Sequence, residues 1–202
     1  LAHCREQRLI TGVATSVCRA NIDDVLTRDF VNAMIRRGAH YLWYYIYRPV
    51  GPDPAPEQAL DEDQILRLRR FLVDIRPQVP ILVVDAYWDH EGRGLCPAAT
   101  GISHHVSPGG ALEPCPPIQF ACDHIGDGGG VVAAIEQSRF LPAFRDLAAA
   151  TTRGCILLEA PGRLAELVRE YQAGDSSGRG SALAELERSC EGPSHCLTGR
   201  EI

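Results

Sequence analysis

The sequence lacks the features that mark membrane proteins and nucleic-acid-binding proteins. No apolar run reaches the roughly 18 residues that a helix needs to span a bilayer, and nothing at the start resembles a signal peptide. There is no lysine- or arginine-rich face, and the formal charge of −6 argues against binding to nucleic acid or to anionic membranes. The 202 residues, 45% of them hydrophobic, suffice for a packed core. We therefore expect a globular, cytoplasmic protein with a small or proteinaceous partner.

The first 85 residues alternate apolar strands with amphipathic helices. Buried strands are expected at residues 9–18, 41–47 and 80–85, and helices at residues 21–38 and 61–76. This order is typical of a parallel α/β sheet. Because residues 1–8 read as the end of a helix, and three strands cannot close a barrel, we expect the chain to hold the last part of a larger α/β domain. A doubly wound sheet is the alternative, and neither has a glycine-rich phosphate loop in these residues. A Gly/Ser-rich linker is expected at residues 174–181.

A stretch rich in cysteine, glycine and proline, residues 95–122, follows the expected strands. It carries Cys96, Cys115 and Cys122, together with the adjacent His104 and His105. Residues 107–110 are typical of the turn of a short hairpin between residues 101–106 and 111–113. The chain's eight cysteines would fit either disulfides or a metal site, and a cytosolic location favours metal because cytosolic thiols stay reduced.

The identity of the metal follows from the ligands that are present and absent. Four thiolates are the usual complement of a four-iron cluster, and Cys155 is the expected fourth ligand beside Cys96, Cys115 and Cys122. Zinc held by the same three cysteines with Cys155 or His104 is the alternative. The tight C-x2-C knuckles of structural zinc are absent, which favours iron–sulfur. Cys190 and Cys196, in a polar tail, are expected to be exposed free thiols.

Polar groups follow the expected strands at their carboxyl ends, where parallel α/β folds build their sites. Such groups can hold a carboxylate, a ribose or an adenine by hydrogen bonding, ion pairing and stacking. Each also has a structural interpretation, since an asparagine here can cap a helix and an arginine can form a surface ion pair. The candidates are Arg19 and Asn21, then Tyr47, Arg48 and Asp53, then Asp85, Tyr87, Trp88, Asp89 and His90.

The spacing C-x13-G-x4-C, formed by Cys96, Gly110 and Cys115, resembles a known family. Placed after the strands of a parallel α/β domain, it is similar to the start of the auxiliary-cluster region (SPASM or twitch) of radical S-adenosylmethionine enzymes. The run YWDHEGRGLCPAATGISHHVSPGGALEPCP is similar to uncharacterised bacterial members. The resemblance implies an α/β fold: the C-terminal portion of a partial (β/α)6 TIM-like barrel over residues 1–90, a small α+β cysteine-rich extension over residues 91–160, and C-terminal helices with a polar tail over residues 161–202.

The resemblance also implies an activity for the complete protein. An enzyme of this family uses a 4Fe–4S cluster and S-adenosyl-L-methionine to generate a 5′-deoxyadenosyl radical that abstracts hydrogen from its substrate. The substrate would be a small molecule or a peptide, and the electron donor a flavodoxin or a ferredoxin. The auxiliary cluster would be held by the four cysteines Cys96, Cys115, Cys122 and Cys155. Cofactor-binding positions at the strand ends would be Arg19, Asn21, Tyr47 and Arg48.

Two motifs of the family are missing from these residues. The C-x3-C-x2-C loop that ligates the catalytic cluster is absent, so the chain by itself should not catalyse the reaction. The C-x2-C-x5-C-x3-C segment is absent as well, which implies a single auxiliary cluster. The alternative function is a non-catalytic interaction module that zinc or a cluster stabilises.

Overall fold

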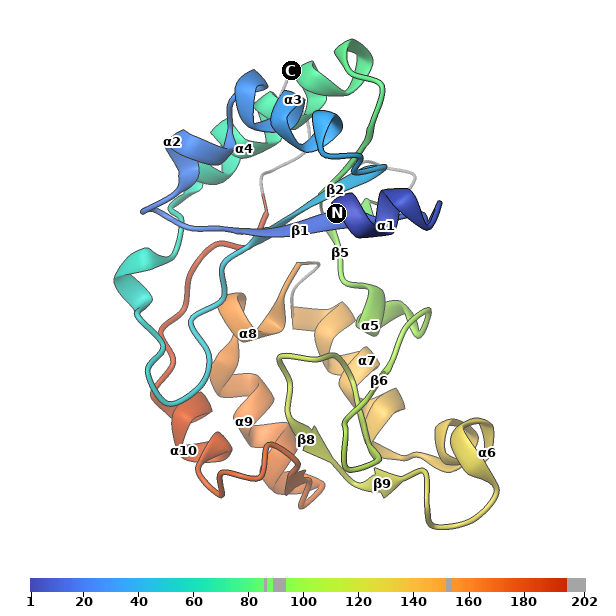
Figure 1. Cartoon of the computed structure of the whole chain (residues 1–202). Coiled ribbons are helices and arrows are strands. Elements are labelled where there is room, and N and C mark those ends of the chain that lie inside the picture. The colour runs from blue at the N-terminus through green and yellow to red at the C-terminus, as the bar shows by residue number, and fades with distance from the viewer. Residues whose placement is uncertain (86, 89–93, 152–153, 196–202) are drawn as a thin grey trace. The chain divides into compact units, whose positions relative to one another are not determined.

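The computed structural model describes residues 1–85, 87–88, 94–151 and 154–195 (Figure 1). The chain forms two compact units. Unit 1 contains Leu1–Tyr47 and Ala55–Gly94, with the segment from Pro193 onward, and unit 2 contains Arg48–Pro54 and Leu95–Gly192. The loop after the second strand therefore belongs to unit 2, although the strand before it and the helix after it belong to unit 1. None of the helices in the described part of the chain has the length and apolarity needed to cross a membrane.

Unit 1 is built on a parallel sheet whose strands follow the predicted apolar segments. The strands lie in the order β1 (Gly12–Val17), β2 (Tyr41–Ile46) and β3 (Leu82–Val84), with Gly12 opposite Tyr41 and Tyr41 opposite Leu82. The three predicted strands and their parallel pairing are thus confirmed. Each crossover is helical, as a parallel connection requires.

The predicted barrel is wrong. Within the described ranges the strands form this parallel sheet and a three-stranded sheet in the order β6 (His105–Val106), β7 (Ala111–Glu113) and β9 (Asp123–His124). Two two-stranded sheets pair β4 (Tyr87–Trp88) with β5 (Gly94–Leu95) and β10 (Gly174–Asp175) with β8 (Phe120–Ala121), and no barrel closes among these strands. The reason is that strand–helix alternation stops after β3. The glycines and prolines that follow favour tight turns, and tight turns join antiparallel strands without a crossover helix. The fold is a mixed α/β arrangement with several small sheets.

The first crossover is two helices where the sequence predicts one. Helix α2 (Ile22–Val25) ends after one turn, and α3 (Arg28–Arg36) begins at Thr27, whose hydroxyl accepts a hydrogen bond from the Phe30 amide at 3.1 Å. Threonine is a strong N-cap residue, so it restarts the helix inside a continuous amphipathic pattern. The short α1 (Ala2–Glu6) precedes β1.

The second crossover, α4 (Glu62–Ile75), confirms its predicted start. Asp61 and Gln64 form a capping box: the Asp61 carboxylate accepts from the Gln64 amide at 2.9 Å, and the Gln64 side chain accepts from the Asp61 amide at 3.1 Å. The 3-10 turns Pro56–Gln58 and Arg76–Gln78 flank this helix.

The two faces of the parallel sheet differ in composition. Helices α3 and α4 cover one face (Figure 1), where Val17, Leu42 and Tyr44 are buried. On the other face β2 presents aromatic side chains while β1 presents small ones, in the register pairs Gly12 with Tyr41, Ala14 with Trp43 and Ser16 with Tyr45. The rings of Trp43 and Tyr45 stack with centroids 5.0 Å apart. Small residues on β1 leave space for the neighbouring rings, because a Cβ at position 12 would lie 2.1 Å from the Tyr41 ring.

Unit 2 combines short antiparallel strands with helices around an apolar core. Phe140, Phe144, Ile156 and Leu164 are at most 1% exposed in this core. The predicted hairpin is confirmed, with His105 opposite Glu113. The strands are β6 (His105–Val106), β7 (Ala111–Glu113), β8 (Phe120–Ala121), β9 (Asp123–His124) and β10 (Gly174–Asp175). The helices are α5 (Pro97–Thr100), α6 (Gly130–Gln137), α7 (Phe140–Thr151), α8 (Ile156–Glu159), α9 (Pro161–Glu170) and α10 (Ala182–Glu187).

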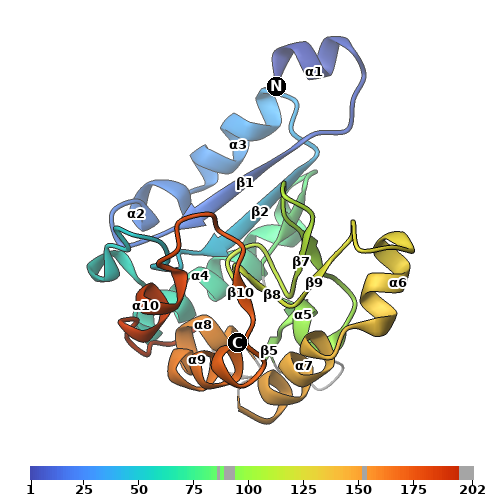
Figure 2. The same cartoon turned by 90° about the horizontal axis from the view of Figure 1, so that it is seen from below.

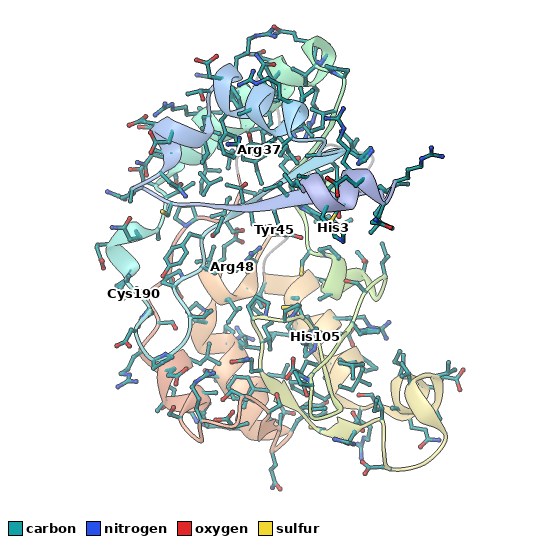
Figure 3. The ribbon with its side chains drawn as sticks, viewed as in Figure 1. His3, Arg37, Tyr45, Arg48, His105 and Cys190 are labelled. Carbon is teal, nitrogen blue, oxygen red and sulfur yellow. The ribbon has the colours of Figure 1, made fainter. Side chains whose placement is uncertain are left out.

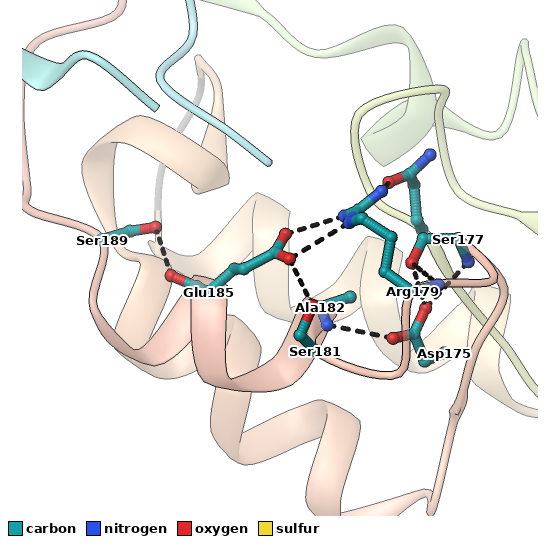
Figure 4. A network of polar contacts seen from close by, with 8 residues as sticks. Asp175, Ser177, Arg179, Ser181, Ala182, Glu185 and Ser189 are labelled. Atoms are coloured by element: carbon teal, nitrogen blue, oxygen red, sulfur yellow. Dashed lines mark hydrogen bonds and ion pairs between the residues drawn. The ribbon is translucent and has the colours of Figure 1, made fainter. Parts of the chain in front are cut away.

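The Gly/Ser-rich segment predicted as a linker, residues 174–181, is held by hydrogen bonds. Figure 2 shows β10 beside β8, with which it pairs antiparallel. The Asp175 carboxylate accepts hydrogen bonds from the amides of Ser177 at 2.8 Å and Ala182 at 3.0 Å (Figure 4). Arg179 donates two hydrogen bonds to Glu185, at 3.1 and 2.7 Å. Composition did not reveal these interactions, because Glu185 and strand β8 lie outside the segment.

Replacing Asp85 should destabilise unit 1 strongly. Its carboxylate is 10% exposed and accepts from Arg69 at 2.8 Å and from Arg76 at 2.6 Å. Asp85→Asn removes the charge shared by two partly buried guanidinium groups, and we expect a loss of about 3 kcal/mol in the free energy of unfolding. Urea unfolding followed by circular dichroism measures the loss. The control is Asp23→Asn, which breaks the exposed ion pair with Arg67 and should cost less than about 1 kcal/mol. Equal losses would contradict the role of burial.

The Asp175 network should make unit 2 sensitive to acid. Burial raises the pKa of Asp175, but hydrogen bonds from Ser177 and Ala182 and the charge of Arg179 outweigh it, so the pKa lies below its ordinary value. Hydrogen bonds from Arg179 and Ser181 likewise lower the pKa of Glu185. These carboxylates therefore stabilise the fold above the ordinary carboxyl pKa of about 4, and that contribution is lost as the pH falls toward their folded values.

Thermal melts between pH 7 and pH 3 test this expectation. Asp175→Asn should lower the melting temperature most at pH 7 and progressively less below about pH 4, where the wild-type carboxylate also becomes protonated. Asp127→Asn, at an exposed position of the same unit, is the matched control and should follow the wild-type curve. A constant difference between Asp175→Asn and wild type at every pH would contradict the argument.

Candidate functional site

Three of the four predicted cysteine ligands come together in unit 2. Cys96, Cys115 and Cys155 all pack against the same apolar core. Burial raises the pKa of Cys96 and of Cys115, and the negative charge of a Cys155 thiolate raises both further. Cys96 also raises the pKa of Cys115. Because such effects weaken with distance, this mutual influence identifies the three thiols as neighbours.

Each of these cysteines stands at the start of a tight turn. The carbonyl of Cys96 accepts from the Ala99 amide at 3.0 Å, and that of Cys115 from the Ile118 amide at 2.9 Å. The carbonyl of Cys155 accepts from Leu158 and Glu159, both at 2.9 Å. Amides at the start of a turn point back toward the first side chain, and those of Ala99 and Ile118 lower the pKa values of the Cys96 and Cys115 thiols in opposition to burial.

Arg48 faces all three cysteines. Its Nε donates a hydrogen bond to the Cys155 sulfur at 3.0 Å, and Figure 3 labels its side chain. Burial lowers the pKa of the guanidinium, but the charges of Cys155, Cys115 and Cys96 and the hydrogen bond to Cys155 outweigh burial and raise it. The sequence predicts Arg48 as a cofactor-binding residue at a strand end. The structure places it two residues after the end of β2, in the loop that belongs to unit 2, and its role toward a cofactor stays a prediction.

Cys122 lies in a different environment. It is exposed, its thiol donates to the Tyr171 carbonyl at 3.5 Å, and its pKa is raised by burial of the sulfur and by the neighbouring Asp123. Its role as a fourth ligand stays a prediction. Cys190 is an exposed free thiol, as expected, whereas Cys196 lies outside the described residues.

The geometry of the cysteine group differs from that of a site for one ion. Among the described residues, no three side chains of His, Cys, Asp or Glu are arranged to hold a single metal ion. Zinc binds sulfur at about 2.3 Å in a tetrahedron, so its ligand sulfurs lie about 3.8 Å apart. A four-iron cluster binds each thiolate through a different iron and spreads the sulfurs more widely.

His104, the alternative zinc ligand, makes different contacts. Its Nδ1 is buried and has no hydrogen-bond partner among the described residues. Burial and the neighbouring Arg145 lower its pKa. A metal cation bound to the His104 imidazole would be repelled by the positive charge of the neighbouring Arg145 guanidinium, so His104 is a poor metal ligand.

The remaining strand-end candidates make contacts within unit 1. Arg19 donates to the Ala59 carbonyl at 2.8 Å and contacts Asp61 at 3.3 Å. Asn21 accepts from the Cys18 amide at 2.9 Å and donates to the Ser16 carbonyl at 2.8 Å, so it holds the turn after β1 rather than the end of the helix. The Tyr47 amide donates to Val17 at 2.9 Å. Their roles toward a cofactor stay predictions. Asp89 and His90 lie outside the described residues.

One polar group was missed by sequence reasoning. The Glu113 carboxylate is 2% exposed and contacts His105 Nδ1 at 2.7 Å (labelled in Figure 3), while Ser176 Oγ donates to it at 2.5 Å. The contact between His105 and Glu113 could have been predicted from the hairpin, because its register sets these two residues opposite each other. Ser176 arrives from a segment 63 residues away, which no local pattern reveals.

No protein-family profile, curated protein sequence or solved structure matches the chain. The likeness to radical S-adenosylmethionine enzymes therefore rests on the residues of the cysteine motif.

The metal-free protein should show slow alkylation at the cysteine group. The nucleophile is the thiolate, and the raised pKa values of Cys96 and Cys115 reduce its population. We expect both to react with iodoacetamide at least about tenfold more slowly at pH 7 than the exposed Cys190, since each pKa unit above the pH changes the thiolate fraction tenfold. Peptide mass spectrometry measures the rates. They should converge in denaturant; equal rates in the folded protein would contradict the prediction.

Proposed function

We propose that the chain binds an iron–sulfur cluster through Cys96, Cys115 and Cys155, as the auxiliary-cluster region of a radical S-adenosylmethionine enzyme. The observation that supports the proposal is the meeting of three cysteines, distant in sequence, around a partly buried arginine. Two of them, with Gly110, form the spacing that resembles this family. Three thiolates and one guanidinium form a charge arrangement that suits a cluster, whose properties depend on net charge and on hydrogen bonds to sulfur.

The chain's own residues would perform three tasks. The cysteines supply thiolates, and the turns that each one begins aim backbone amides at the Cys96 and Cys115 sulfurs. Arg48 neutralises part of the negative charge. The apolar core behind the cysteines keeps water away from one side of the site. When bound, the cluster would supply one-electron transfer or an iron that holds substrate.

The proposal carries the partners that the family resemblance implies. The donor would be a flavodoxin or a ferredoxin, the substrate a small molecule or a peptide, and S-adenosyl-L-methionine the cofactor of the complete enzyme. A cytoplasmic location fits, because reduced thiols are kept available for metal there.

Cysteine variants test the ligand set. After anaerobic reconstitution with iron and sulfide, we expect Cys96→Ser, Cys115→Ser and Cys155→Ser each to lose most of the bound iron and the visible charge-transfer absorbance, since each removes one ligand. Iron and sulfide analysis with absorbance spectra measures the loss. Cys122→Ser and Cys190→Ser are the matched controls and should retain both.

Two outcomes would contradict the proposal. Wild-type protein that takes up stoichiometric zinc and no iron would favour the zinc-stabilised module. A Cys122→Ser variant that loses iron as completely as Cys155→Ser would show that the three-cysteine set is wrong.

A further inference from the structure

We propose that Arg145 and His104 in unit 2 form a binding site for an oxyanion, the carboxylate or phosphate group of a small molecule. The inference goes beyond the proposed function and does not depend on a cluster. It starts from two polar groups that the fold leaves without partners. The Arg145 guanidinium makes no hydrogen bond or ion pair with a described residue, and neither does the buried Nδ1 atom of His104.

Arg145 is held in place by the loop that follows α5. It lies half-buried on α7, and its side chain packs against the backbone of Gly101. A Cβ at position 101 would stand 2.6 Å from Arg145 Nη1 and 3.3 Å from its Cδ. Gly101 has a φ of +72°, in the left-handed region that favours glycine, so it ends α5 and leaves space for the arginine. The described residues thus position a half-buried cation without giving it a negative partner.

His104 follows Gly101 by three residues and supplies the second group. Buried polar atoms in folded proteins are nearly always hydrogen-bonded, so the orphan Nδ1 calls for an explanation such as a bound ion. Burial and the charge of Arg145 lower the pKa of His104, which agrees with a guanidinium close to the imidazole. The same positive charge that would repel a metal cation at this position attracts an anion.

An oxyanion would satisfy both groups. A guanidinium presents five N–H donors in a planar fork that matches the oxygens of a carboxylate or a phosphate. The His104 ring is only partly buried, and rotation about its Cβ–Cγ bond, a soft torsion, turns a ring N–H toward an anion at Arg145 without moving the backbone. A neutral imidazole already carries one N–H donor, so binding needs no protonation of His104.

An NMR titration of the full chain tests the inference. Sodium acetate and inorganic phosphate are added separately at constant pH and ionic strength, and the Cε1–H signal of His104, identified by its loss in His104→Gln, is followed. We expect a saturable shift with a dissociation constant of about 1–10 mM for at least one anion. Arg145→Gln should weaken binding at least about tenfold, because it removes the charged donor. Arg139→Gln, which removes an exposed arginine just before α7, is the matched control and should bind like wild type.

The two anions and a second variant decide the result. Saturation by acetate, by phosphate or by both supports the inference and identifies the chemistry of the ligand. No saturable shift with either anion overturns it, and so does equal weakening in Arg139→Gln and Arg145→Gln. Gly101→Ala keeps the charge but displaces the guanidinium, so we expect weaker binding with a folded spectrum. If Arg145→Gln does not fold, Gly101→Ala decides: affinity equal to wild type overturns the inference.

Discussion

The hydrogen bond between Arg48 and the Cys155 sulfur is the interaction on which the arrangement of the cysteine group depends. Burying a guanidinium is costly unless negative groups surround it, and the groups here are thiols that burial by itself would keep neutral. The charged guanidinium therefore favours thiolates beside it, and thiolates favour the charged guanidinium. The chain contains no lysine, so its cations other than histidine are arginines, which stay charged when partly buried. Burial nevertheless outweighs the charge of Arg48 at Cys96 and Cys115, so the pKa values of both thiols stay raised.

The two units meet different physical requirements. Unit 1 is held by a parallel sheet whose helix-covered face forms a core. Its other face carries the aromatic side chains Tyr41, Trp43 and Tyr45 of β2, which lie beside small residues of β1. Unit 2 has strands of two or three residues, so helices and side-chain hydrogen bonds carry more of its stability. Its polar groups, Asp175 and Glu113 among them, connect segments that pair over only a few residues.

Prediction from the sequence succeeded where local patterns are strong. It failed where residues distant in sequence determine the local structure. The strands of unit 1, the capping box at Asp61 and the hairpin after His105 follow from short-range signals. The break at Thr27 was missed because an apolar helical pattern continues across it. The order in residues 174–181 was missed because the acceptor Glu185 and the partner strand β8 lie outside the segment. The barrel was inferred from family likeness, and the strands after β3 do not continue it.

The sequence by itself supplied candidates for a metal site, because Cys96 and Cys115 flank a glycine at a spacing that resembles a known family. It also determined the parallel α/β start, because apolar strands and amphipathic helices are local patterns. Only the tertiary structure decided that Cys155 packs against the same core as these two, that Cys122 contacts Tyr171, and that Arg48 donates to the Cys155 sulfur. Spacing along a chain does not encode which turns meet in space; the packing of α5, α7, α8 and α9 around one core does.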